Sequence, residues 1–130
     1  MDEGCVLIVE ADILVRQPMA EYLRDCGYKV AEAANVTEAR QLLRERKMPI
    51  DLVLADAGAD PDGCFALAQW IRSSQPGLDV ILAGTVPKMA SEAGELCEDT
   101  SIKKPYDHIL VLERIKQARA ARDRQGLDRR

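Results

Sequence analysis

Short apolar runs recur along the chain, and segments with helical spacing separate them. Five runs have the length of β-strands: residues 6–9, 28–33, 52–55, 80–83 and, with a weaker pattern, 100–103. Residues 52–55 are apolar without alternation, which is typical of a strand covered on both faces. We therefore expect parallel strands, with the third strand in the centre of the sheet.

The first helical segment follows the first run. It places four side chains on one face, at the spacing i, i+4, i+7 and i+11: Val15, Met19, Tyr22 and Cys26. Pro18 lies inside this segment, where it is tolerable only near the first turn. Gly27 is well suited to end the helix.

Four more helical segments follow the other runs. Asn35 and Glu38 predict a capping box at the start of the second helix, and Pro49 prevents its continuation. The remaining helical patterns run through Ala39, Leu42 and Leu43; through Phe65, Ala68 and Ile71; through Met89, Ala93 and Leu96; and from Asp107 through Ile109, Leu112 and Ile115. Pro76 and Gly77 end the third helix, and Gly94 interrupts the fourth.

A strand followed by a helix, repeated five times, predicts an α/β fold. The expected architecture is a doubly wound sheet of five parallel strands with helices on both faces. The length of 130 residues fits one domain. We expect this domain to span residues 4–120, with residues 121–130 as a polar tail or the start of a linker.

Composition narrows the class of protein. The chain is 47% hydrophobic and 31% charged, with a net charge of −4. Duplex nucleic acid is therefore an unexpected direct partner, because phosphate binding needs a basic face. No apolar run approaches the ~20 residues that cross a membrane, and the N-terminus lacks the pattern of a signal peptide. We expect a cytoplasmic protein without a membrane span.

The four cysteines show no metal-binding spacing. Cys5, Cys26, Cys64 and Cys97 form no C-x-x-C pair, and the chain has one histidine, so a zinc site is not expected. In a cytosolic protein we expect all four to be reduced thiols that behave as small apolar residues.

Acidic residues stand where the predicted strands end. Glu10 and Asp12 follow the first strand, and Asp56 ends the third. Ligands of open parallel sheets bind at this edge, so these acids converge if the two strands are neighbours. Like charges raise each other's pKa, and a lysine from the fifth strand or a divalent cation would relieve the repulsion. Oxygen ligands of this kind suit Mg²⁺.

The order and spacing of six motifs resemble those of a response-regulator receiver domain, the phospho-accepting part of two-component signalling. The motifs are VLIVE-x-D followed by LVR, AANVTEARQLL, IDLVLAD, Asp62-Gly63, VILAG and KKPYD. The resemblance covers roughly residues 6–120. It implies a flavodoxin-like (βα)5 fold with strand order 2-1-3-4-5.

The resemblance also assigns residues to a phosphorylation site. Asp56 falls on the phospho-acceptor and Lys104 on the lysine that contacts the phosphoryl group, and the Lys104-Pro105 bond is typically cis in the family. The backbone carbonyl of Gly58 and the side chains of Glu10 and Asp56 would bind Mg²⁺. The hydroxyl that contacts the phosphoryl group in the family would have to come from Thr85.

The resemblance implies partners as well. A sensor histidine kinase or phosphotransfer protein would donate the phosphoryl group, and a downstream protein target would read the result. Dimers through the fourth and fifth helices are common in the family, so a homodimer is among the implied states. The domain is a signalling module and is not itself expected to be an enzyme.

Several positions depart from the family pattern. Ala11 replaces the second acid after the first strand, which is the direct metal ligand, so we expect weakened Mg²⁺ binding. Asp12 would compensate if its side chain pointed the same way as that of Glu10, because side chains two apart on an extended segment share a face. Gly84 replaces the Thr or Ser that ends the fourth strand, and Ser101 replaces the aromatic switch residue.

Two functional classes therefore remain open. One is a working receiver that is phosphorylated on Asp56 with weakened dependence on Mg²⁺. The other is a degenerate pseudo-receiver that binds proteins independently of phosphorylation. An enzyme on the same scaffold is disfavoured, because the chain has no Gly-rich phosphate loop and no Ser/His/Asp or Cys/His set.

Overall fold

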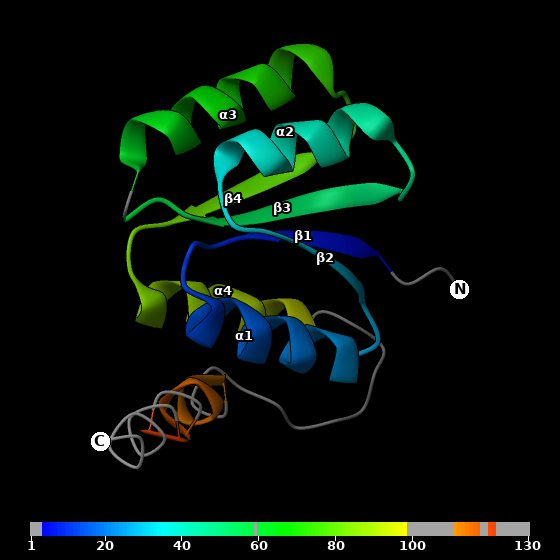
Figure 1. Ribbon diagram of the computed structural model, residues 1–130. Coiled ribbons are helices and arrows are strands. Elements are labelled where there is room, and N and C mark those ends of the chain that lie inside the picture. The colour runs from blue at the N-terminus through cyan, green and yellow to red at the C-terminus, as the bar shows by residue number, and fades with distance from the viewer. Residues whose placement is uncertain (1–3, 59, 99–110, 118–119, 122–130) are drawn as a thin grey trace.

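Four parallel strands form the sheet, in the order β2-β1-β3-β4 (Figure 1). The computed structural model describes residues 4–58, 60–98, 111–117 and 120–121. The strands are β1 (Cys5–Val9), β2 (Lys29–Ala33), β3 (Ile50–Asp56) and β4 (Asp79–Ala83). The first four expected strands, their parallel direction and their order are confirmed. The described sheet has four strands rather than five, since the segment 100–103 lies outside the described residues.

Helices cover both faces of the sheet. The bounds of the helices are α1 (Ile13–Asp25), α2 (Val36–Glu45), α3 (Pro61–Ser74) and α4 (Val86–Glu98). In Figure 1, α2 and α3 lie on one side of the sheet and α1 and α4 on the other, where helical residues 111–117 lie as well. None of the helices among the described residues has both the length and the apolar character needed to cross a membrane.

Strand β1 is buried along its whole length, because helices cover both of its faces. Val6 and Ile8 belong to the core shared with α1 and α4, whereas Leu7 and Val9 belong to the core shared with α2 and α3. This alternation follows from the two-residue period of side chains along a strand. Burial on both faces explains why the run is apolar without interruption.

The capping box of α2 is confirmed. Asn35 Oδ1 accepts a hydrogen bond from the Glu38 backbone N–H (2.9 Å), and Glu38 Oε1 accepts one from the Ala34 N–H (2.8 Å). The prediction for α3 needs a correction, since Phe65 is 56% exposed. The buried face of α3 runs instead through Cys64, Leu67, Ala68 and Ile71.

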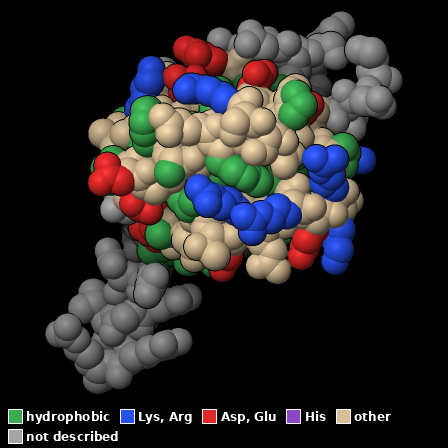
Figure 2. All heavy atoms as spheres, turned by 90° about the horizontal axis from the view of Figure 1, so that it is seen from above, with side chains coloured by type: hydrophobic (Ala, Val, Ile, Leu, Met, Phe, Trp, Pro, Cys, Tyr) green, Lys and Arg blue, Asp and Glu red, His purple; other side chains and the backbone are tan. Residues whose placement is uncertain are grey.

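The layer formed by α2 and α3 carries the single tryptophan. The Trp70 ring is half-buried, and the guanidinium groups of Arg40 and Arg44 lie 5.6 and 5.7 Å from its centroid. Figure 2 looks onto this layer and shows basic side chains lying beside hydrophobic ones. Stacking of guanidinium groups on an aromatic ring stabilises the contact between the two helices.

The prediction that all cysteines are reduced is wrong for two of them. Cys26, the C-cap of α1, forms a disulfide with Cys97 near the end of α4, with Cα atoms 5.7 Å apart. Both residues are buried in the same core. The two residues are 71 positions apart in the sequence, so their proximity is visible only once α1 and α4 lie side by side. Cys5 and Cys64 are free and buried, as expected.

Candidate functional site

The ends of β1 and β3 bring two acidic side chains together. The two strands pair in parallel, with Val9 opposite Ala55. Glu10 follows Val9 and Asp56 follows Ala55. The carboxyl groups of Glu10 and Asp56 share a hydrogen bond. The expectation that acids from the first and third strands converge is therefore confirmed. The reason is that neighbouring parallel strands end at the same edge of the sheet.

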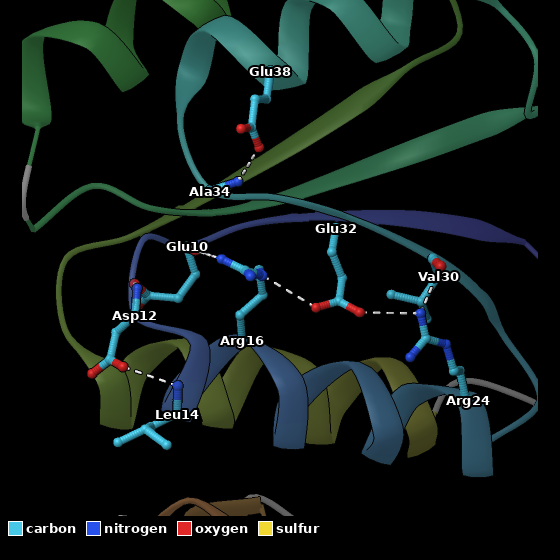
Figure 3. Close-up of polar contacts among 9 residues, drawn as sticks. All are labelled: Glu10, Asp12, Leu14, Arg16, Arg24, Val30, Glu32, Ala34 and Glu38. Atoms are coloured by element: carbon cyan, nitrogen blue, oxygen red, sulfur yellow. Dashed lines mark hydrogen bonds and ion pairs between the residues drawn. The ribbon is translucent and has the colours of Figure 1, made fainter.

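Glu10 is held through all of its polar groups. Its backbone N–H donates to the Ala33 carbonyl (3.0 Å), and its own carbonyl accepts a hydrogen bond from Arg16 Nη1 (2.8 Å). Its carboxylate Oε2 accepts from the Asp12 N–H (2.8 Å), as Figure 3 shows. The residue is only 5% exposed. Such complete satisfaction is what allows a polar side chain to be buried.

The environment of Glu10 favours its protonated form. The pKa of Glu10 is raised from its ordinary value of 4.5 to about 7, and burial is the largest cause. The hydrogen bond to Asp56 and the negative charges of Asp56 and Asp12 contribute to this rise, while the hydrogen bond from the Asp12 N–H opposes it. The negative charge of Asp56 and the burial of Glu10 therefore both oppose ionisation of the Glu10 carboxyl.

Asp56 ends β3 and is half-buried. Its Oδ1 accepts a hydrogen bond from the Gly58 N–H (2.9 Å), and its carbonyl accepts a long one from the Cys64 thiol (3.5 Å). Asp56 and Glu10 line a cavity of about 120 Å³. Typical pockets for organic ligands measure ~300–1,000 Å³, so this cavity is suited to a small group.

The rest of the cavity lining was not predicted as part of the site, except for position 11. Its residues come from the ends of neighbouring elements: Val9, Ala11, Ala34, Asn35, Val36, Asp60 and Cys64. Asp60 caps α3 by accepting a hydrogen bond from the Gly63 N–H (3.0 Å), and Pro61 begins the helix. The Asp-Pro pair is a helix-start signal that could have located this acid beside the site.

Cys64 does not have the character of a nucleophile. Burial raises the pKa of its thiol, and the charges of Asp60 and Asp56 raise it further. A thiol with a raised pKa stays protonated near neutral pH, and the protonated form is a poor nucleophile. The chemistry of the pocket therefore falls to its carboxyl groups.

Gly58 is required by a close approach between two loops. A Cβ atom at this position would lie 2.8 Å from the Gly84 carbonyl oxygen and 3.1 Å from Asp56 Oδ1. The first distance is shorter than a nonbonded contact allows, and the atom concerned belongs to the backbone. The end of β4 and the loop after Asp56 therefore approach closely only because residue 58 lacks a side chain.

The remaining predicted residues differ in their placement. Asp12 is the N-cap of α1, and its Oδ1 accepts from the Leu14 N–H (2.9 Å), so its carboxylate points toward the helix in Figure 3. Thr85 Oγ1 accepts from the Lys88 N–H (3.2 Å) at the start of α4. Lys104 and Pro105 lie outside the described residues, as does Ser101.

The oxygen atoms of the pocket are of the type that Mg²⁺ prefers as ligands, but the side chains supply too few of them to complete its coordination. Glu10 and Asp56 supply carboxylate oxygens, and the ion would offset their mutual repulsion. Ala11 supplies no ligand, and Asp12 uses one oxygen to cap α1. Within the described ranges, no three acidic, histidine or cysteine side chains form a ready metal-binding group. Water would have to complete the coordination.

Comparison with known proteins identifies the family of the chain. The family model of the response regulator receiver domain matches residues 6–116. A cyclic di-GMP phosphodiesterase from Thermotoga maritima is 31% identical over 121 residues, which cover 92% of this chain and 31% of that protein. A putative NtrX-like response regulator from Rickettsia felis is 29% identical and is covered over 25% of its length. The chain thus spans less than a third of either relative.

Solved structures extend the comparison to the fold. A response regulator from Thermotoga maritima superposes with a TM-score of 0.58 at 25% identity, covering 90% of this chain and 98% of that one. The receiver domain of Ssk1 from Saccharomyces cerevisiae, solved with the histidine phosphotransfer protein Ypd1, gives a TM-score of 0.53 at 18% identity. That match covers 73% of each chain. The chain belongs to the response regulator receiver domain family, whose members act as signalling modules in two-component systems.

Proposed function

We propose that Asp56 accepts a phosphoryl group from a sensor histidine kinase or a phosphotransfer protein. The observation that carries this proposal is the position of Asp56 at the end of a central strand, in a cavity of about 120 Å³ beside Glu10. The phosphotransfer class of donor is supported by the complex of a similarly folded receiver domain with Ypd1.

The transfer exchanges one bond for another. A carboxylate oxygen of Asp56 forms a bond to phosphorus while the P–N bond to the donor histidine breaks, and the electron pair of that bond returns to the imidazole. Negative charge on the transferred oxygens must be offset, since such transfer depends on positioning and electrostatics. Mg²⁺, when bound by Glu10 and Asp56, would supply part of that positive charge.

Two further residues complete the proposal. Lys104, which lies outside the described residues, would offset the remaining charge. The Thr85 hydroxyl accepts a bond in capping α4, which leaves its proton able to point toward a phosphoryl oxygen after a small shift. The phosphorylated domain would then bind a downstream protein target or a second copy of itself in the cytoplasm.

A specific observation also supports a second candidate. The Glu10 carboxyl is buried beside Asp56 with a raised pKa, and neither Ala11 nor Gly84 offers a side chain for the metal or the phosphoryl group. A domain of this kind would act as a phosphorylation-independent adaptor that binds its partner in one state.

Intact mass spectrometry after incubation with acetyl phosphate separates the two candidates. Wild type and Asp56→Asn are each incubated with and without Mg²⁺. One added phosphoryl group in the wild type and none in the variant is the result expected for a working receiver. The dependence of the yield on Mg²⁺ measures how well the pocket binds the ion without an acid at position 11.

The absence of an adduct from a folded wild-type protein would reject the first candidate. An adduct that persists in Asp56→Asn would reject the assignment of the acceptor. Asp60→Asn provides a matched control, because it neutralises another acid of the same cavity while an asparagine retains the ability to cap α3.

A further inference from the structure

A single guanidinium group links the acid pocket to the first helix and to the edge strand. Arg16 lies on α1, and its Nη1 donates to the Glu10 carbonyl (2.8 Å) while its Nε donates to Glu32 Oε1 on β2 (3.1 Å). The Arg16 side chain is 14% exposed and that of Glu32 is 28% exposed. Figure 3 shows the guanidinium group between the two acceptors.

The consequence for Glu10 is geometric. Glu10 leaves the sheet immediately after β1, and only Ala11 separates it from the N-cap residue of α1. Its N–H is already bound to β2 through Ala33, so the Arg16 bond fixes the other side of the same residue. A residue held at both its N–H and its carbonyl has little backbone freedom, so the direction in which its side chain leaves the backbone is set.

Arginine is suited to this task where lysine is not. The planar guanidinium presents N–H groups in two fixed directions, so one side chain can serve a carbonyl and a carboxylate at the same time. A lysine ammonium group would carry the same charge on a flexible stem without the fixed fork. Glu32 on β2 holds the guanidinium group of Arg16 in the orientation that also binds the Glu10 carbonyl.

We propose that Arg16 is a positioning residue of the acid pocket, which keeps the Glu10 carboxyl against Asp56 by binding the Glu10 carbonyl and the Glu32 carboxylate together. This inference rests on the proposed function for its effect on phosphorylation. Its effect on the order of the β1–α1 connection does not depend on phosphorylation.

The chain contains a matched control. Arg24 lies two turns further along α1 and binds the other oxygen of the same carboxylate, Glu32 Oε2 (3.3 Å), and the Val30 carbonyl (3.0 Å). Its side chain is 45% exposed, whereas that of Arg16 is 14% exposed. Removal of either arginine therefore takes one cation from Glu32, but only Arg16 also binds Glu10.

The experiment compares Arg16→Ala with Arg24→Ala in two measurements. The first is the rate of Asp56 phosphorylation by acetyl phosphate at saturating Mg²⁺. The second is amide hydrogen exchange at Glu10 and Asp12, followed by NMR. We expect Arg16→Ala to slow phosphorylation and speed both exchange rates roughly tenfold. Arg24→Ala should leave each within about twofold, as for an exposed ion pair.

Two further variants keep the proposal testable if Arg16→Ala does not fold. Arg16→Lys should recover part of the lost rate, because the charge remains while the fork is lost. Glu32→Gln should change both measurements in the same direction as Arg16→Ala, by a smaller factor of about three, because it removes only the anchor of the guanidinium group.

Defined outcomes would overturn the proposal. Equal effects of Arg16→Ala and Arg24→Ala would show that both residues only stabilise α1 against β2. Unchanged exchange at Glu10 and Asp12 in Arg16→Ala would have the same meaning. If the wild type takes up no phosphoryl group, the proposed function fails, and the exchange measurements alone decide the role of Arg16.

Discussion

The ends of β1 and β4, which lie on either side of β3, differ in how completely their residues are held. At the end of β1, called here the acid side, Glu10 is buried and its backbone and carboxylate are all hydrogen-bonded. At the end of β4, called here the β4 side, Gly84 is exposed, and a Cβ added there would meet no atom of the described residues within 4 Å. Thr85 beside it is exposed and caps α4.

This difference indicates where the chemistry of the pocket lies. On the acid side, burial and the negative charges of neighbouring carboxylates raise the pKa of Glu10. On the β4 side, Gly84 has no side chain, and the described residues leave room for one. Under the proposed function, the acid side supplies the acceptor Asp56, while the β4 side has no side chain at position 84 to contact the phosphoryl group.

The largest expected effect concerns the connection between the two sides. The Cys26–Cys97 disulfide joins α1, which follows the acid side, to α4, which follows the β4 side. It closes a segment of 71 residues, so loop-closure entropy predicts that reduction lowers the free energy of unfolding by roughly 4 kcal/mol. Urea unfolding with and without dithiothreitol measures this change.

The control is Cys97→Ala, in which dithiothreitol should have no further effect. Equal stability of the oxidised and reduced wild type would show that the disulfide contributes nothing to the folded state. Mass spectrometry after alkylation confirms which thiols have reacted in each sample.

The next effect tests how far the ionised Glu10 carboxylate destabilises the folded protein. A folded-state pKa of about 7 against an ordinary 4.5 means that the folded protein binds more protons than the unfolded one between these values. Glu10 therefore lowers stability as pH rises from 4.5 to 7, by up to about 3 kcal/mol. Glu10→Gln should remove this slope and make the protein more stable than wild type at pH 8.

Urea unfolding at pH 5 and pH 8 provides the measurement. Asp12→Asn is the matched control, because asparagine can still cap α1 while the charge is removed two residues away from Glu10. If the wild type and Glu10→Gln had parallel pH profiles, the carboxyl of Glu10 would not be strained in the folded protein.

A pair of glycine substitutions sharpens the contrast in packing. Gly58→Ala places a Cβ 2.8 Å from the Gly84 carbonyl oxygen and should cost about 1–3 kcal/mol of stability. Gly84→Ala enters open space and should change stability by no more than about 0.5 kcal/mol. Thermal unfolding of the two variants would contradict the comparison if their midpoints shifted equally.

The smallest effect concerns position 11, where the proposed Mg²⁺ site has an alanine instead of an acid. Ala11→Asp adds a carboxylate next to Glu10 at an exposed position that lines the cavity, and should raise Mg²⁺ affinity roughly tenfold, which is about 1.4 kcal/mol. Isothermal titration calorimetry with MgCl₂ measures this affinity. Ala11→Asn, which has nearly the same shape without the charge, should produce a smaller gain, and no gain from Ala11→Asp would place the metal site elsewhere.

The sequence by itself determined the elements and the meeting of the acids. Apolar runs marked all four described strands, and Asn35 with Glu38 marked the start of α2 correctly. The convergence of Glu10 and Asp56 followed from parallel neighbouring strands. These features depend on local periodicity and on topology, and both leave a readable pattern in the residues.

Only the tertiary structure decided which partners these residues have. The Cys26–Cys97 bond and the Arg16–Glu32 ion pair join residues distant in the chain, and no spacing rule pairs them. Phe65 was misassigned because a helix with several apolar positions does not reveal which stripe faces the core. Burial, which raises the pKa of Glu10, likewise belongs to the packed molecule, because it depends on what surrounds the side chain on every side.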